Sequence, residues 1–220
     1  HFHLSQSIAI KCDEPKWIPE KSLASKVASL LQEATGCSKG VAIEVNKLIP
    51  LVSGLGGDSS DAAATLYGLN ELWDLQLSLP ELLKLASQLG SDVAFFLYGG
   101  TALAKGRGEI VTLLPSLPPM WVVLAIPPVP RIQGKTERLY ASLKTGYYTS
   151  GQITDRLVVL LNKSGEMTPS NLFNVFDNVA LDSFTGLREY WQQFLAAGAQ
   201  EIHLAGSGPT LFTLTKDKIQ

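Results

Sequence analysis

The chain has 220 residues, 45% of them hydrophobic, and its formal net charge at pH 7 is -2. This balance provides no basic field that would attract nucleic acid or an anionic membrane, so we expect neither as a partner. The longest apolar stretches, such as residues 121–126, are too short to span a bilayer. Cys12 and Cys37 have no metal-binding spacing and the three histidines are scattered. We therefore expect free thiols, no resident metal ion and a cytoplasmic protein.

Hydrophobic periodicity predicts strands and helices that alternate along the first half of the chain. Strands are predicted over residues 2–12 and 41–45, helices over 21–33, 59–73, 79–89 and 93–97, and a strand pair over 101–104 and 110–113. Ser78, Pro80 and Glu81 form a strong helix start, with an N-cap serine and an early proline. Because the chain opens within an alternating pattern, we expect its first domain to be truncated at the start.

Prolines at positions 115, 118 and 119 mark a change in composition, and we place a domain boundary there. The first domain then covers residues 1–117 and the second covers 118–220. In the second domain the pattern predicts a buried strand over 121–126, strands over 203–205 and 210–214, and helices over 135–143, 152–161 and 184–196. Residues 216–220 follow a strand directly, so we expect this domain to be truncated at its end.

The most informative segment is rich in glycine and runs directly into a helix: Pro50-Leu51-Val52-Ser53-Gly54-Leu55-Gly56-Gly57-Asp58-Ser59-Ser60. Its glycines allow a ligand to approach the backbone closely. A helix start offers unpaired N–H groups and partial positive charge, which together favour a phosphate. The segment is not a P-loop, since it has no lysine, and it lacks the third glycine of the dinucleotide fingerprint. A simple glycine turn before a helix is the alternative interpretation.

The string P-x-x-x-G-L-G-G-x-S-S-D-A-A resembles the ATP loop of the GHMP kinases. Further strings in the same order resemble one family of that superfamily, the 4-diphosphocytidyl-2-C-methyl-D-erythritol kinases: LNELW at 69–73, LGSDVAFF at 89–96, GGTA at 99–102, GRGE at 106–109, KT at 135–136 with Tyr140, and GSGPT at 206–210. The resemblance covers nearly the whole chain. It implies a two-domain α+β fold, with an N-terminal ribosomal-protein-S5-like α/β domain and a C-terminal ferredoxin-like domain.

The resemblance also implies a function. The chain would be an ATP- and Mg²⁺-dependent kinase that phosphorylates the 2-hydroxyl of 4-diphosphocytidyl-2-C-methyl-D-erythritol in the non-mevalonate isoprenoid pathway. Residues 50–60 would bind ATP, and Asp92 would be the catalytic base, with a helix N-cap as its alternative role. Four further residues would contact the substrate: Thr136, Gly206, Ser207 and Gly208.

Three positions depart from the family pattern. The first-strand motif P-A-K-x-N-L, which carries the family's catalytic lysine, does not occur in this chain. Asp58 replaces a glycine, and we expect it to N-cap the helix with Asp61 as its partner; the alternative is a carboxylate beside phosphate that requires Mg²⁺. Ala94 replaces a proline. Two other functions therefore stay open: another GHMP kinase, of the phosphomevalonate or homoserine type, and a nucleotide-binding module without catalysis.

Overall fold

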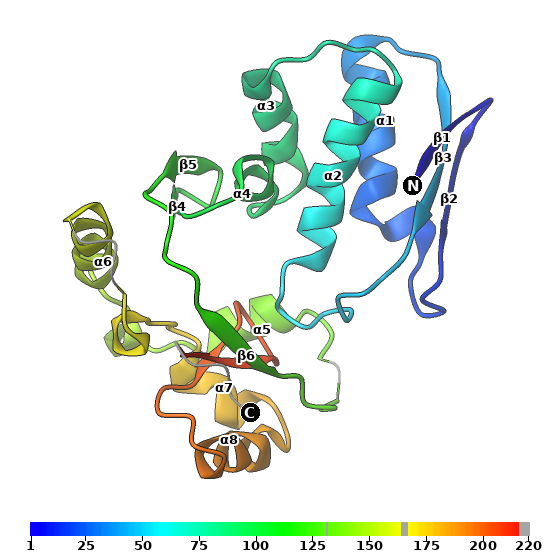
Figure 1. Ribbon diagram of the computed structural model, residues 1–220. Coiled ribbons are helices and arrows are strands. Elements are labelled where there is room, and N and C mark those ends of the chain that lie inside the picture. Colours follow the sequence, from blue (N-terminus) through cyan, green and yellow to red (C-terminus); the bar gives the residue numbers. More distant parts are fainter. Residues whose placement is uncertain (131, 164–166, 216–220) are drawn as a thin grey trace. The chain divides into compact units, whose positions relative to one another are not determined.

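The computed structural model describes residues 1–130, 132–163 and 167–215. The chain forms two compact units (Figure 1). The first unit contains residues 1–51 and 56–113, and the second contains residues 52–55 and those from 114 onward. The sequence predicted a division after residue 117, and it gave no indication that Val52–Leu55 belongs to the second unit. The sequence also predicted that the second domain is truncated at its end. That prediction concerns residues 216–220, which lie outside the described residues.

A three-stranded sheet in the first unit has the order β1-β3-β2. Its strands are β1 (Phe2–Ser5), β2 (Ile8–Cys12) and β3 (Gly40–Val45). Strand β1 is antiparallel to β3, with Phe2 opposite Ile43, whereas β2 is parallel to β3, with Ile8 opposite Val41. The helices α1 (Leu23–Thr35) and α2 (Gly57–Leu72) lie side by side against this sheet (Figure 1).

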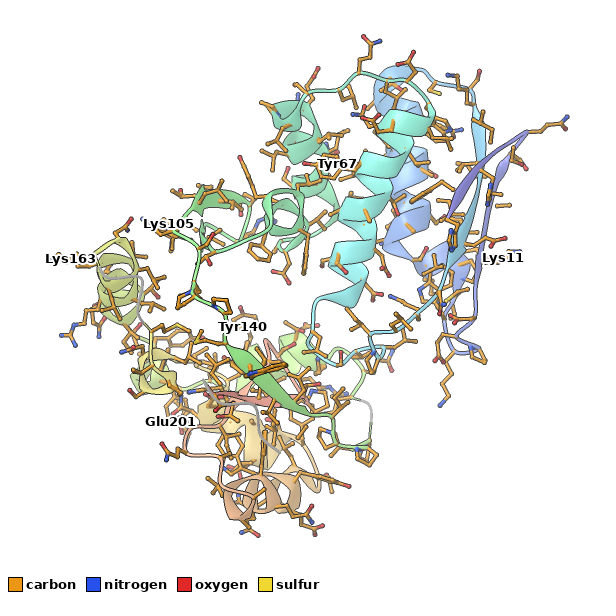
Figure 2. All side chains as sticks on the ribbon, viewed as in Figure 1. Lys11, Tyr67, Lys105, Tyr140, Lys163 and Glu201 are labelled. Atoms are coloured by element: carbon orange, nitrogen blue, oxygen red, sulfur yellow. The ribbon has the colours of Figure 1, made fainter. Side chains whose placement is uncertain are left out.

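The core of the first unit lies among these helices, α3 (Leu79–Leu89), α4 (Val93–Tyr98) and the sheet. The predicted capping box forms, since the Glu81 carboxylate accepts a hydrogen bond from the Ser78 backbone N–H at 2.8 Å. Trp73 is fully buried and donates its indole N–H to the Gly40 carbonyl at 3.3 Å. Tyr67 projects from α2 (Figure 2) and donates to the Leu97 carbonyl of α4 at 2.9 Å. An antiparallel hairpin of β4 (Ala102–Lys105) and β5 (Ile110–Leu113) completes this unit.

The described residues of the second unit form a three-stranded antiparallel sheet of order β6-β8-β7 and four helices. Its strands are β6 (Trp121–Ala125), β7 (His203–Leu204) and β8 (Leu211–Thr215), and its helices are α5 (Lys135–Ser142), α6 (Gln152–Lys163), α7 (Asp177–Ser183) and α8 (Leu187–Ala196). Short 3₁₀ turns, as in the first unit at Pro19–Lys21, occur at Thr145–Tyr147 and Pro169–Asn171. The core contains Leu139, Phe184, Leu187, Leu204 and Leu211.

Two predictions for the second unit are wrong in detail. Strand β6 is not buried as predicted, because Val122 and Leu124 are 54% and 45% exposed. The helix predicted over 184–196 is α8, which begins only at Leu187 after Gly186, whose φ is +86°, and the sequence did not predict α7 before it. The seven-residue α7 is too short for its apolar period to stand out from a loop, and its stability depends on packing against the core.

Asp177, the first residue of α7, fixes the strand that leads to the 205–210 turn. Asp177 accepts a hydrogen bond from the Leu204 backbone N–H at 2.8 Å, and its other oxygen lies 2.8 Å from Nδ1 of His203. The hydrogen bond with Asp177 raises the pKa of His203 above its ordinary value, against burial, which would lower it. A charged His203 therefore stabilises this part of the second unit.

No helix in the described ranges is long and apolar enough to cross a membrane. The same ranges contain no group of three or more His, Cys, Asp or Glu side chains arranged to hold a metal ion. Cys12 and Cys37 are free thiols.

Shortening a buried side chain in the core of the first unit should destabilise the protein. Leu66 is fully buried, so Leu66→Ala should lower the free energy of unfolding by roughly 2–5 kcal/mol through lost burial and the cavity left behind. Leu48 is 86% exposed and supplies the matched control. Leu48→Ala should change the free energy of unfolding by less than about 0.5 kcal/mol. Urea unfolding measures both, and equal effects would contradict the assigned core.

The His203–Asp177 pair predicts a pH-dependent stability. A raised folded-state pKa adds stability that is fully present below the unfolded value of 6.5 and is lost as the pH rises through the folded value. Asp177→Asn should therefore be most destabilising in acid, and the difference from wild type should shrink above pH 6.5. Part of this difference in stability should remain above that pH, because the substitution also weakens the hydrogen bond from the Leu204 N–H. Asp182→Asn, with a carboxylate 86% exposed, should show no such trend in thermal unfolding.

Candidate active site

The glycine-rich segment enters α2 through a left-handed residue. Gly56 occupies the N-cap position with φ +72°, and the helix begins at Gly57. A Cβ added at Gly56 would lie 2.7 Å from Cζ of Phe96, so glycine allows the α4 aromatic ring to pack against the helix start. The hydroxyl of Ser60 donates to the Gly57 carbonyl at 2.8 Å. The amides of the first turn, from Gly57 to Ser59, have no helical acceptor and can bind an anion.

Asp58 does not have the predicted role of N-cap. It is the second residue of α2, and the N-cap position is occupied by Gly56, which has no side chain. Instead Nζ of Lys47 lies 2.6 Å from Oδ1 of Asp58 and 2.6 Å from Oδ2 of Asp61. The Lys47 side chain is only 5% exposed, so this ammonium depends on the two carboxylates for its partners.

The pKa of Lys47 reflects this pairing. Burial alone would lower the pKa, but the hydrogen bonds and charges of Asp58 and Asp61 outweigh it and raise the pKa above its ordinary value. Lys47 therefore stays charged and offsets part of the negative charge at the start of α2. This compensation weakens the repulsion that Asp58 would otherwise exert on a phosphate.

Asp92 is at the start of α4 and has a free carboxylate. It occupies the N-cap position with φ -90° and ψ -12°, but its side chain makes no capping hydrogen bond. Its carboxylate has no hydrogen-bond or ionic partner within the described ranges, and the residue is exposed. A Cβ added at Gly108 would lie 2.7 Å from the Ser91 carbonyl, so the β4–β5 hairpin packs on the backbone beside Asp92. The hairpin-tip residues Lys105 and Arg107 are exposed.

The tip of the glycine-rich segment, Val52–Leu55, packs in the second unit against the 205–210 turn. The Thr210 N–H donates to the Ser53 carbonyl at 3.2 Å. A Cβ added at Gly54 would lie 2.2 Å from the Ala205 carbonyl oxygen, and one at Gly206 would lie 3.1 Å from the Gly54 oxygen. These glycines therefore allow direct contact between the two backbones.

The 205–210 turn is held by side chains around it. Nδ2 of Asn174 donates to the Leu204 and Gly206 carbonyls, each at 2.8 Å. The hydroxyls of Thr136 and Ser207 lie 2.9 Å apart and share a hydrogen bond. The structure thus brings the predicted substrate residues Thr136, Gly206, Ser207 and Gly208 together with Val52–Leu55, whereas Asp92 and residues 56–60 belong to the first unit.

Lys135 is a buried cation beneath this contact. It is 8% exposed, and its Nζ donates to the Val52 carbonyl at 3.1 Å and to the Gly208 carbonyl. Burial lowers its pKa to about 8. Val52 itself has φ +61°, a left-handed conformation that costs a β-branched residue on the order of 1–3 kcal/mol.

Sequence reasoning gave no role to several residues that shape this site: Lys47, Lys135, Asn174 and Asp177. A signal existed for Lys47, since a lysine three positions before Pro50 precedes a helix start with two aspartates. Lys135 also had one, because it lies one helical turn before the buried Leu139 and so on the apolar face of α5. Asn174 and Asp177 act on residues about 30 positions away, which a local pattern does not reveal.

The paired aspartates predict a non-additive effect on stability. Asp58→Asn or Asp61→Asn alone leaves Lys47 with one carboxylate, but the double variant leaves a nearly buried charge with none of the partners described here. The double variant should be less stable than the sum of the single effects by roughly 0.5–3 kcal/mol. Urea unfolding tests this, and the two substitutions should become additive in a Lys47→Met background. Additivity with Lys47 present would show that the ion pairs are not coupled.

Comparison with known proteins identifies related chains. Residues 22–100 match the family model for the GHMP kinases N terminal domain. A 4-diphosphocytidyl-2-C-methyl-D-erythritol kinase from Dehalococcoides mccartyi is 48% identical over 217 residues, which cover 99% of this chain and 76% of that protein.

Among solved structures, a 4-(cytidine 5'-diphospho)-2C-methyl-D-erythritol kinase has a TM-score of 0.76 and 31% identity, and the match covers 97% of this chain and 75% of that one. A homoserine kinase from Cytophaga hutchinsonii has a TM-score of 0.77 at 24% identity, over 99% of this chain and 76% of that one, which shows the shared fold alone. These matches confirm the two-domain α+β architecture expected of GHMP kinases. The sequence identity selects among them: this chain is a phosphotransferase and belongs to the 4-diphosphocytidyl-2-C-methyl-D-erythritol kinase family.

Proposed function

We propose that this protein transfers the γ-phosphate of ATP to the 2-hydroxyl of 4-diphosphocytidyl-2-C-methyl-D-erythritol, a step of the non-mevalonate isoprenoid pathway. The observation that carries the proposal is the 48% identity, over 99% of the chain, to a kinase named for this substrate. The fold itself supports only an ATP-dependent kinase of the GHMP class, because a homoserine kinase matches it equally well.

Residues 50–60 are the ATP-binding segment in this proposal. Phosphoryl transfer depends mainly on positioning and on stabilisation of the phosphate charge. The free amides at the start of α2 and the partial positive charge of that helix end suit the phosphates. The Lys47 ammonium beneath Asp58 and Asp61 reduces the negative charge that the phosphates meet.

Asp92 is the general base in this proposal. A base must be able to reach the attacking hydroxyl and must not be occupied by a permanent partner. The Asp92 carboxylate meets the second requirement within the described ranges, because it neither caps α4 nor forms an ion pair there. The exposed carboxylate is open to a substrate hydroxyl.

Mg²⁺ would enter with the ATP phosphates. Protein sites for this ion supply few ligands and leave the rest to phosphate and water. Among the polar side chains that open α2, Ser60 is bonded to Gly57, and both aspartates are paired with Lys47. The hydroxyl of Ser59 has no hydrogen bond to the described residues, so Ser59 is the side chain that fits a magnesium ligand. When bound, the ion would neutralise charge on the transferred phosphate.

The substrate-contacting residues in this proposal are Thr136, Gly206, Ser207 and Gly208. The paired hydroxyls of Thr136 and Ser207 are both accessible and can donate to a hydroxyl or phosphate oxygen of the substrate. Gly206 would act through its backbone, whereas Gly208, whose N–H donates to the Ala205 carbonyl and whose own carbonyl accepts from Lys135, would act by packing against the tip of the glycine-rich segment.

A substrate panel tests the function. The protein from its complete reading frame, supplied with ATP and Mg²⁺, should consume ATP with 4-diphosphocytidyl-2-C-methyl-D-erythritol and not with homoserine or phosphomevalonate. Consumption with homoserine or phosphomevalonate alone would assign it to another class of GHMP kinase. ATP binding without consumption on any of the three would support a nucleotide-binding module.

Asp92→Asn tests the catalytic role. The amide keeps the shape of the side chain but cannot accept the proton, so turnover should fall roughly 10²–10⁴-fold. The melting temperature and ATP affinity should stay close to wild type, because the carboxylate makes no capping bond. Asp155→Asn, an exposed aspartate of α6, is the matched control and should keep full turnover. Turnover of Asp92→Asn within a few-fold of wild type at saturating substrate would remove Asp92 from the mechanism.

A further inference from the structure

We infer that Lys135 is a positioning residue, which holds the tip of the glycine-rich segment, Val52–Leu55, in the conformation that binds ATP. The inference rests on the proposed function only in assigning this segment to ATP. It is carried by contacts that all lie within the second unit.

The partners of Lys135 are unusual for a buried cation. Its Nζ donates to the carbonyls of Val52 and Gly208, one on each of the two backbones that meet here. Neither partner carries a charge, and the Lys135 ammonium forms no ion pair with the described residues. An ammonium with only carbonyl acceptors is costly to bury, and this agrees with its lowered pKa of about 8. Lys135 therefore contributes little to stability as a charge, and its hydrogen bonds to the two backbones are its distinctive feature.

The residue that Lys135 holds is strained. Val52 is β-branched and has φ +61°, which neighbouring contacts must maintain. Gly54 and Gly208 fix the backbone two residues further along the segment, but the Lys135 bond acts on Val52 itself. Without that donor, the Val52 peptide would be free to turn toward an unstrained conformation.

The orientation of this peptide matters for an anion. In a trans peptide the C=O and the N–H point in opposite directions. A Val52 carbonyl fixed on Lys135 therefore turns the Ser53 N–H away from the lysine, and this N–H has no acceptor among the described residues. A turned peptide would instead present a carbonyl oxygen to the phosphates and repel them. Lys135 thus controls whether the tip offers a donor or an acceptor.

The test compares Lys135→Met with Lys144→Met, an exposed lysine of the same unit, in the full-length protein. Methionine has a similar length and no donor, and replacing a buried charge by an apolar side chain is often tolerated. If the competent conformation falls to about one tenth of the population, ATP affinity measured by calorimetry should fall roughly tenfold in Lys135→Met alone. Turnover at saturating ATP should stay within about threefold of wild type, because ATP binding selects the same bound state.

Two further variants separate positioning from general stability. Lys135→Arg keeps the donors and should retain most of the ATP affinity. Adding Val52→Gly to Lys135→Met should recover much of the loss, because glycine adopts a positive φ without steric cost. If Lys135 supported only general stability, Lys135→Arg would not retain the ATP affinity and Val52→Gly would not restore it.

Hydrogen exchange supplies a readout that does not involve ATP. The Thr210 amide, which donates to the Ser53 carbonyl, should exchange faster in Lys135→Met than in Lys144→Met. Unchanged exchange with unchanged affinity would overturn the inference, as would faster exchange with unchanged ATP affinity. If the wild-type protein consumed no ATP in the substrate panel, the proposed function would fail, while the exchange comparison would still decide whether Lys135 holds the tip. If Lys135→Met did not fold, Lys135→Gln, whose neutral side chain is one bond shorter, would replace it in the same comparison, and an unaltered Thr210 exchange rate in that variant would overturn the inference.

Discussion

The contact of one backbone with another at Gly54 is the constraint on which the arrangement of the candidate residues in the second unit depends. No side chain fits between Gly54 and the Ala205 carbonyl, since an added Cβ would lie 2.2 Å from that oxygen. Only glycine permits this approach, and the Ser53–Thr210 hydrogen bond then fixes the register of the two segments. The tip Val52–Leu55 is consequently part of the second unit, although the chain on both sides of it belongs to the first.

Two lysines support the glycine-rich segment in opposite electrostatic settings. Lys47 lies between two carboxylates, which raise its pKa and keep it charged. Lys135 has only carbonyl acceptors, and burial lowers its pKa to about 8. Lys47 therefore adjusts the charge at the start of α2, whereas Lys135 acts through the direction of its hydrogen bonds. The same residue type performs two functions because burial and partners, rather than identity, determine its chemistry.

The comparison structures separate what the fold decides from what the side chains decide. A homoserine kinase and a kinase of cytidine-diphosphate-linked methylerythritol match this chain with nearly equal TM-scores, 0.77 and 0.76. A shared fold therefore leaves the acceptor undefined, since function depends on the residues placed in the site. Sequence identity over almost the whole chain assigns the family, and our proposal for the reaction then uses the free carboxylate of Asp92 and the paired hydroxyls of Thr136 and Ser207.

The sequence by itself determined most element types, the glycine-rich segment and the family, because periodic apolar patterns, capping signals and glycine runs are local properties; the short helix α7 was missed. The capping box at Ser78 and Glu81 formed as predicted for that reason. Tertiary structure decided the role of Asp58, whose partner Lys47 is 11 residues away, and the placement of Val52–Leu55 with the 205–210 turn. It also decided that Lys135 would be buried against Val52, 83 residues earlier in the chain. Local patterns could mark Lys47 and Lys135 as candidates, but the partners that these lysines bind depend on how the packed elements close on one another, and no window of neighbouring residues contains that information.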